Sequence, residues 1–575
     1  MWSLGIAAIA LGFVKTGPVH LQIDRYFDFA KFGCLPGSRK IYLFLLSGPL
    51  LALVGILGVV ALKHAPNNWD SMTYHLGRIV HWKQEQSVAA YATNITRQVQ
   101  MQPLAEYMVA HLLLLTGSDH LANCVQWGAM LLSGMGVSLI AKQMGGNIWQ
   151  QVGAAAVCWA IPMGVLQATS TQNDYVNAFW LVCFISIGIS LLESQKKVWH
   201  FIPLGVGLGL ALLTKATAYV YAFPFCMWFG FSILKKTPRR QLPLIALCIL
   251  CPALLINSGH YLRNVDLYSS PLGPADEYAN QAISIQGFSS NLIRNAAIHT
   301  SIPFLDTYNH FMAKGLEKLH SLTGLSPSDP RYTMAGGNPF SGESSLDEDY
   351  TGNPFHWALI CLGLITGAFE FLFFGWDKKR AIFRWFNLSI WAGFGLLCLF
   401  VKWQPWISRL QLPLFVLWSP VISLALIRSK IRISVIIPFI LIFMSFIWIS
   451  YNPNRPAFFQ SDQIDTPRTR QYFTKKPELF SLFTQIVDSI QKSGCHEVGL
   501  KVSEDAWEYP IWVMFADSRY PVTIQHIRVE NPSKKLMPKN FKPCAIISNI
   551  PDVEFDIPDS IQNFGEYTLY LIPMP

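Results

Sequence analysis

The sequence predicts an α-helical protein that crosses a membrane many times and carries a small α/β domain at its C-terminus. Only 14% of its 575 residues are charged and the mean hydropathy is +0.31. An ordinary soluble domain carries roughly 25% charged residues. The apolar residues also fall in blocks, and the longest, 41–62, has the length of about 20 residues that a bilayer crossing requires.

Apolar segments account for about 11–12 transmembrane helices, since each is long enough, or nearly so, to cross a bilayer. They are 1–14, 41–62, 121–141, 152–168, 175–192, 201–213, 218–234, 242–256, 357–376, 386–401, 410–427 and 433–450. The first, Met1–Val14, is either an additional span or part of a longer one. The pair within 201–234 is either two helices or one bent element.

Basic residues collect in every second loop, and this asymmetry orients a membrane protein. The loops that are rich in basic residues carry, in chain order, Lys15, Arg25, Lys31, Arg39 and Lys40; Lys142; Lys196 and Lys197; Lys235, Lys236, Arg239 and Arg240; Lys378, Lys379, Arg380 and Arg384; and Arg428, Lys430 and Arg432. The short loops of the opposite set hold little beyond Lys215, Lys402 and Arg409. The rich loops are therefore cytoplasmic, and the formal charge of +9 does not indicate a nucleic-acid partner.

The same alternation divides the chain into three regions of a multi-pass protein of the cell membrane. Residues 1–40 form an N-terminal apolar segment with a cytoplasmic loop. Residues 41–450 form a membrane domain whose large loops, 63–120 and 257–356, lie outside. Residues 451–575 form an extracytoplasmic soluble domain.

This C-terminal tail is predicted to be α/β. Pro477–Lys492 has the periodicity of an amphipathic helix, and strand-like runs follow at Val498–Val502, Val522–Val529, Ala545–Ile550 and Tyr567–Ile572. Cys495 and Cys544 each directly precede one of these runs. If the two strands are parallel neighbours, their starts are close enough for a disulfide, which an oxidising exterior permits.

Asp70 comes shortly after the span 41–62 and opens a polar stretch that includes Tyr74, His75, Arg78, His81 and Lys83. On a helix along the membrane surface, Asp70, Tyr74 and Arg78 share one face. This face offers a base, a phenol and a cation for an anionic group. The alternative is an amphipathic helix whose charges only face solvent.

Asp174, preceded by Asn173, lies between two apolar stretches, where an ionisable group is a candidate functional residue. The alternative is that Asn173 or Asp174 caps the helix beginning at Tyr175. Other outer-facing candidates are the cations Lys215, Arg263 and Arg409, which bind phosphate or, alternatively, snorkel to the interface. Asn264 follows Arg263 and is a further candidate.

Asp347 and Asp349 form a DxD pattern, which some sugar-transferring enzymes use to hold a divalent metal. The commoner reading is a solvated acidic loop. The histidines show no HExxH spacing, and the chain has no Walker or GxGxxG loop. We therefore expect no required cofactor, and the DxD pair is the candidate for a metal.

Taken in order, several of these residues resemble motifs of the polytopic GT-C glycosyltransferases. The likeness is to the bacterial branch related to protein O-mannosyltransferases and aminoarabinose transferases (glycosyltransferase family 39), and covers roughly residues 41–450. The motifs are Asp70 with Tyr74, Gln102-Pro103 at the end of the first outer loop, Asn173-Asp174, Leu-Thr-Lys ending at Lys215, Arg263-Asn264 before Pro271, and Arg409 with Pro413. Relatives often have Lys or His at the position of Gln102, so another cation would be needed here.

The resemblance implies inverting transfer of a sugar from a polyprenyl-phosphate donor to a glycan, lipid or protein acceptor at the outer face. Asp70 is then the general base or the residue that orients the acceptor nucleophile, and Asp174 is a second catalytic residue. The implied substrate-binding residues are Tyr74, His75, Arg78, Lys83, Gln102, Asn173, Lys215, Arg263, Asn264 and Arg409. The alternatives are an envelope polysaccharide polymerase or ligase and a flippase or transporter of lipid-linked sugar.

Overall fold

The computed structural model describes residues 37–193, 197–274, 277–373, 378–426, 431–458, 466–550 and 560–572. The predicted segment 1–14 lies outside these residues. The chain divides into two compact units, Met1–Leu51 and Ala52–Pro575. The site described below lies wholly in the second unit.

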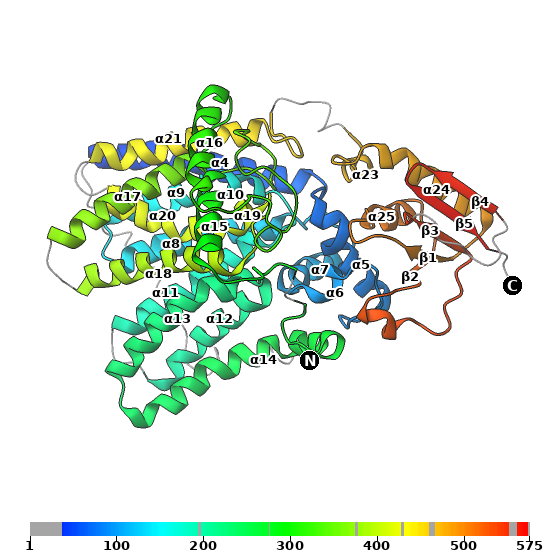
Figure 1. Ribbon diagram of the computed structural model, residues 1–575, viewed down its shortest axis with the longest axis horizontal. Helices are drawn as coiled ribbons and strands as arrows, with labels where there is room; N and C mark the ends of the chain where they lie inside the picture. Colours follow the sequence, from blue (N-terminus) through cyan, green and yellow to red (C-terminus); the bar gives the residue numbers. More distant parts are fainter. Residues whose placement is uncertain are drawn as a thin grey trace. The chain divides into compact units, whose positions relative to one another are not determined.

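Six helices of the described chain are long and apolar enough to cross a membrane (Figure 1). They are α4 (Gly37–Lys63), α8 (Cys124–Gln143), α11 (Asp174–Glu193), α13 (Thr217–Lys236), α14 (Leu242–Tyr268) and α18 (Lys378–Phe400). Shorter apolar stretches occur in α7 (Leu104–Thr116), α12 (Ile202–Thr214), α17 (Pro354–Phe373), α20 (Leu412–Leu426) and α21 (Ile431–Ser450). The prediction of a polytopic helical protein is confirmed.

One predicted segment differs from the observed helices. Segment 152–168 is broken into α9 (Ile148–Trp159) and α10 (Pro162–Gln167), because Pro162 begins a new helix and the preceding Ile161 is extended. The predicted segments 201–213 and 218–234 are two helices and not one bent element, since Lys215 between α12 and α13 has extended backbone angles. This break places the lysine at the ends of both helices.

The two long loops that are predicted to lie outside, 63–120 and 257–356, contain several helices. The first loop contains the π-helical turn η1 (Ser71–His75), α5 (Leu76–Glu85), α6 (Arg97–Gln100) and the apolar α7. The second contains α15 (Ile285–Ala297) and α16 (Asp306–Ser321). Shorter elements are η2 (Val198–Phe201), η3 (Arg239–Gln241), α19 (Ile407–Leu410), α23 (Arg468–Gln471) and η4 (Pro532–Leu536).

The tail is α/β, as predicted. Its helices are α24 (Glu478–Ser493) and α25 (Tyr509–Asp517), and its strands are β1 (Glu497–Lys501), β2 (Thr523–His526), β3 (Ala545–Ser548), β4 (Ser560–Phe564) and β5 (Tyr567–Leu571). The strand order is β2-β1-β3-β5-β4, with β1 parallel to β2 and β3, and β5 antiparallel to β3 and β4. The apolar face of α24 is buried, and Phe483 packs edge-on against Tyr567 of β5. β4 was not predicted, because this edge strand is polar and half exposed.

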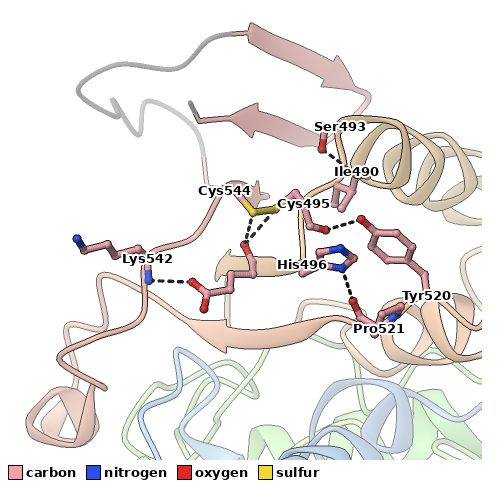
Figure 2. The surroundings of a disulfide bond; sticks show 9 residues. Ile490, Ser493, Cys495, His496, Tyr520, Pro521, Lys542 and Cys544 are labelled. Atoms are coloured by element: carbon pink, nitrogen blue, oxygen red, sulfur yellow. Dashed lines mark hydrogen bonds between the residues drawn. A yellow bond between two sulfur atoms is a disulfide. The ribbon is translucent and has the colours of Figure 1, made fainter. Parts of the chain in front are cut away.

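The predicted bridge between Cys495 and Cys544 is present, with their Cα atoms 5.6 Å apart (Figure 2). Val498 of β1 is in register with Ala545 of β3, so the parallel pairing brings the two preceding cysteines together. The Tyr520 hydroxyl donates to the Cys495 carbonyl, which further fixes this end of the sheet.

Loss of the disulfide should destabilise the tail. Because it closes a loop with a sequence separation of 49, we expect Cys495→Ser to lower the free energy of unfolding by roughly 2–4 kcal/mol. Thermal unfolding of the purified protein, with and without reductant, measures this. Cys251→Ser, at a free cysteine, is the control and should respond to reductant like the wild type. Equal melting of Cys495→Ser and unreduced wild type would contradict the prediction.

Candidate functional site

Asp70 lies immediately before the π-helical turn η1, which leads from the loop after α4 into α5. Asn68 starts this turn by accepting a hydrogen bond from the Ser71 amide at 2.8 Å. A π-helical turn holds more residues than an α-helical one. Tyr74 lies beside Asp70, since Arg97 contacts both residues, whereas Arg78 makes its hydrogen bonds elsewhere.

The buried carboxylate of Asp70 is held between two arginines from distant segments. Arg409 of α19 lies 2.6 Å from Oδ2, and Arg97 of α6 lies 3.7 Å from Oδ1. The guanidinium of Arg97 also lies over the ring of Tyr74, 5.3 Å from its centroid. Burial alone would raise the pKa of Asp70, but Arg409 and Arg97 outweigh it and hold the pKa well below its usual range. Asp70 is thus ionised at neutral pH.

The DxD acids join the same ion-paired network. Asp349 lies 3.1 Å from Arg409 and 2.7 Å from Lys475, a residue of the tail. Asp347 lies 3.1 Å from Lys475 and also accepts from Asn454. Asp349 is buried. The interpretation as a solvated acidic loop is therefore wrong, since these carboxylates bind cations of the protein itself.

Asp174 at the start of α11 pairs with Lys215 at 2.5 Å. The capping alternative is not supported, because Gln126 of α8 accepts from the Tyr175 and Val176 amides. The Asn173 Oδ1 and Asp174 Oδ2 atoms are buried and have no hydrogen-bond partner among the described residues. Buried polar atoms without partners are uncommon, so this helix end offers two acceptors to a further donor.

Arg409 links the two predicted acids electrostatically. Its burial disfavours the charged form, yet Asp70, Asp349 and Asp174 together hold the pKa of Arg409 above its usual range. Burial lowers the pKa of Lys215, although Asp174 opposes this effect. The structure thus brings Asp70, Asp174, Lys215 and Arg409 into one cluster.

Arg78 does not belong to this cluster. Its guanidinium donates to the Gln98, Arg97 and Met101 carbonyls and to Glu106. His75 also bonds Glu106, at 2.8 Å. The hydrogen bonds of Arg78 hold the loop that carries Arg97, and the predicted substrate-binding roles of Arg78 and His75 stay predictions.

Four other predicted residues lie apart from the ion pairs of Asp70. Lys83 is exposed near the end of α5. Arg263 donates to the Tyr107 hydroxyl at 2.8 Å, and Asn264 contacts the His260 ring and the Pro271 carbonyl. Gln102 is buried just before α7. Their predicted substrate-binding roles stay predictions.

The sequence reading missed two cations of the cluster, Arg97 and Lys475. Arg97 occurs in a polar stretch without periodicity, and Lys475 precedes an amphipathic helix in a different region of the chain. Neither position carries a local signal. Only the folded tail brings Lys475 to the DxD acids.

A second group of titratable residues joins the tail to the first outer loop. Donor atoms of His81, Glu508 and His526 lie within 4.8 Å of one another, a set that could hold a metal. However, Glu508 already binds both imidazoles and the Gln98 amide. The Asn94 amide donates to His526 Nδ1, which leaves the proton on Nε2, facing Glu508. A metal-bound histidine usually donates its second nitrogen instead, so the group fits a hydrogen-bond network better than a metal centre.

Next to the DxD acids, Arg455 and Glu348 form an ion pair that is fully buried on both sides. Arg455 also binds the Asn67 side chain and donates to Thr169 Oγ1 at 3.2 Å. These contacts join the beginning of the tail, the first outer loop and the end of α10. The pair therefore fixes the framework around Asp347 and Asp349.

No protein-family model matches the chain, and a sequence comparison with curated proteins finds no match either. Solved structures similar to it include ArnT from Cupriavidus metallidurans bound to undecaprenyl phosphate, at 14% identity over 91% of this chain and 98% of that chain, with a TM-score of 0.41. The apo state of that protein aligns at 12% identity over 93% and 98%, with a TM-score of 0.43.

The archaeal oligosaccharyltransferase AglB from Archaeoglobus fulgidus, in complex with an inhibitory peptide and a dolichol-phosphate, aligns at 12% identity. It covers 87% of this chain and 69% of that chain, with a TM-score of 0.45. At these identities and TM-scores, the similarity says nothing of the residues at the site.

Removing one partner of the buried Arg455–Glu348 pair should destabilise the protein strongly. We expect Arg455→Met or Glu348→Gln to lower the free energy of unfolding by about 3–5 kcal/mol, because each substitution leaves the other residue as a buried charge without a partner. The double variant should recover much of this loss. Thermal unfolding in detergent is the measurement. Asp329→Asn, which removes an ion pair with the exposed Arg331, is the control. Single variants that are no less stable than this control would contradict the prediction.

Proposed function

We propose that this protein is a membrane glycosyltransferase that moves a sugar from a polyprenyl-phosphate donor to an acceptor at the outer face of the membrane. The single observation that carries the proposal is the convergence of Asp70, Asp174 and Asp349 around Arg409. The residues come from segments far apart in the chain, at the ends of apolar helices. The motif resemblance supports the same assignment.

In this proposal Asp70 is the general base. An acceptor hydroxyl must lose a proton as it attacks the anomeric carbon, and a positioned carboxylate accelerates this step by roughly 10²–10⁴-fold. Attack by the acceptor in one displacement, with the lipid phosphate leaving from the opposite side, inverts the anomeric centre. The bond from the hydroxyl oxygen to the sugar forms as the bond from the sugar to the phosphate oxygen breaks.

The ion pairs of Asp70 make its strength as a base depend on the donor. With Arg409 at 2.6 Å, Asp70 binds a proton weakly. A donor phosphate that takes over part of the hydrogen bonding of Arg409 would weaken this pair and make the carboxylate more basic. Substrate binding and activation of the base would then be the same event.

Arg409, Arg97 and Lys215 are the proposed phosphate-binding cations. The leaving phosphate gains negative charge, which fixed cations at a buried site stabilise. Lys215 and Arg409 belong to the set that the motif resemblance implies, and Arg97 is added to it. Arg97 is also the candidate for the cation that Gln102 fails to provide.

Replacing the base tests the proposal. We expect Asp70→Asn to lower kcat for sugar transfer from a polyprenyl-phosphate-linked donor by roughly 10²–10⁴-fold. The assay measures labelled sugar transferred by purified protein in lipid nanodiscs.

Asp119→Asn is the matched control, because Asp119 is also a buried acid paired with an arginine, Arg468, outside this cluster. Both variants should lose comparable stability, but Asp119→Asn should keep its activity as long as it is folded. Near-normal turnover in folded Asp70→Asn would remove Asp70 from the role of base.

A further inference from the structure

The tail contacts both residues that flank Asp70 in the site, Trp69 and Arg97. Asp505, in the turn between β1 and α25, lies 2.5 Å from the Nη2 atom of Arg97. The same Oδ1 atom of Asp505 accepts a hydrogen bond from the Trp69 indole at 3.2 Å. Trp69 is the chain neighbour of Asp70, so one tail carboxylate binds on both sides of the proposed base.

Glu504 adds backbone and side-chain contacts at the same place. Its carbonyl accepts from Arg97 Nη2 at 2.7 Å, and its carboxylate accepts from the Thr96 amide at 2.8 Å. Trp507 packs edge-on against Trp69, with ring centroids 5.1 Å apart. The segment from Glu504 to Trp507 is thus a clamp on α6 and on the residue before Asp70.

The clamp divides the guanidinium of Arg97 between two partners. Its Nη2 atom makes the short contacts to the tail, whereas its Nη1 atom lies 3.7 Å from Asp70. That separation is longer than a hydrogen bond. Arg409, in contrast, is at hydrogen-bond distance from Asp70. Arg97 is therefore held near Asp70 without a hydrogen bond between the two side chains.

We propose that Asp505 and Glu504 position Arg97 for the phosphate of the lipid-linked donor, which makes the C-terminal tail a working part of the site. This inference rests on the proposed function. Without the clamp, Arg97 is expected to move toward Asp70, where the guanidinium would be neutralised and unavailable to a phosphate. Asp505 is a positioning residue, since it acts through Arg97.

The contact is poorly explained as a contribution to stability alone. The Asp505 side chain is 61% exposed and that of Arg97 is 17% exposed. Ion pairs with a solvent-exposed partner stabilise proteins by only about 0–1 kcal/mol. Replacing Asp505 should therefore leave the fold intact and change the site.

A double-mutant cycle on lipid binding tests the proposal. The probe is a synthetic polyprenyl phosphate, titrated against full-length protein in nanodiscs, with the matching phosphate-free polyprenol as the reference. We expect Asp505→Ala to weaken binding of the phosphate by about fivefold, the equivalent of one partly exposed ion pair. Arg97→Gln should weaken it by about tenfold or more, because it removes a charge-assisted contact.

The decisive comparison is the double variant. If Asp505 acts through Arg97, Arg97→Gln with Asp505→Ala should bind no more weakly than Arg97→Gln alone. Glu530→Ala is the matched control, since Glu530 is an exposed tail acid paired with Lys501 at 2.9 Å. It should bind like the wild type. Asp505→Asn, which keeps the shape of the side chain but not its charge, should shift affinity in the same direction as Asp505→Ala.

The outcomes separate the two proposals. Unchanged affinity in folded Asp505→Ala and Asp505→Asn would overturn the positioning role while leaving the donor class in place. The same holds if Asp505→Ala lowers the affinity equally in the wild-type and the Arg97→Gln backgrounds. A wild-type protein that binds polyprenol as tightly as polyprenyl phosphate would overturn both. Loss of affinity in Asp505→Ala that disappears in the Arg97→Gln background supports the proposal.

Discussion

The site depends on neutralising the guanidinium of Arg409 where water is largely excluded. A buried charge costs several kcal/mol unless partners surround it. Asp70 and Asp349 supply those partners directly, and Asp174 contributes at longer range. Because the three acids come from three regions, satisfying one arginine requires η1, the start of α11 and the loop before α17 to meet at the same place.

A second layer of hydrogen bonds holds this arrangement in shape. Arg78 donates to three backbone carbonyls of the loop between α5 and α7, and Glu106 binds both Arg78 and His75. These hydrogen bonds fix the position of the segment that carries Arg97.

Much of the fold could be predicted because its signals are local. Apolar length marks the membrane helices, periodicity marks α24, and strand-like runs mark β1, β2, β3 and β5. The Cys495–Cys544 bridge followed from assuming that two of these strands are parallel neighbours. The position of Asp70 and Asp174 near the ends of apolar helices could also be predicted. The roles of Arg97 and Lys475 could not be predicted, because they come from contacts between regions that share no sequence pattern. The polar β4 lacked any signal, and the break at Ile161 depended on one proline within an otherwise continuous apolar run.

The salt bridges of Lys475 have a consequence for how such a chain can evolve. Lys475 belongs to the tail, yet it contacts Asp347 and Asp349, which precede the last group of membrane helices. A substitution at any of these three positions leaves the remaining charges unbalanced. In related chains these three residues should therefore be substituted together. A chimaera that takes its tail from a distant homologue should be unstable unless it also takes the acidic loop from that homologue.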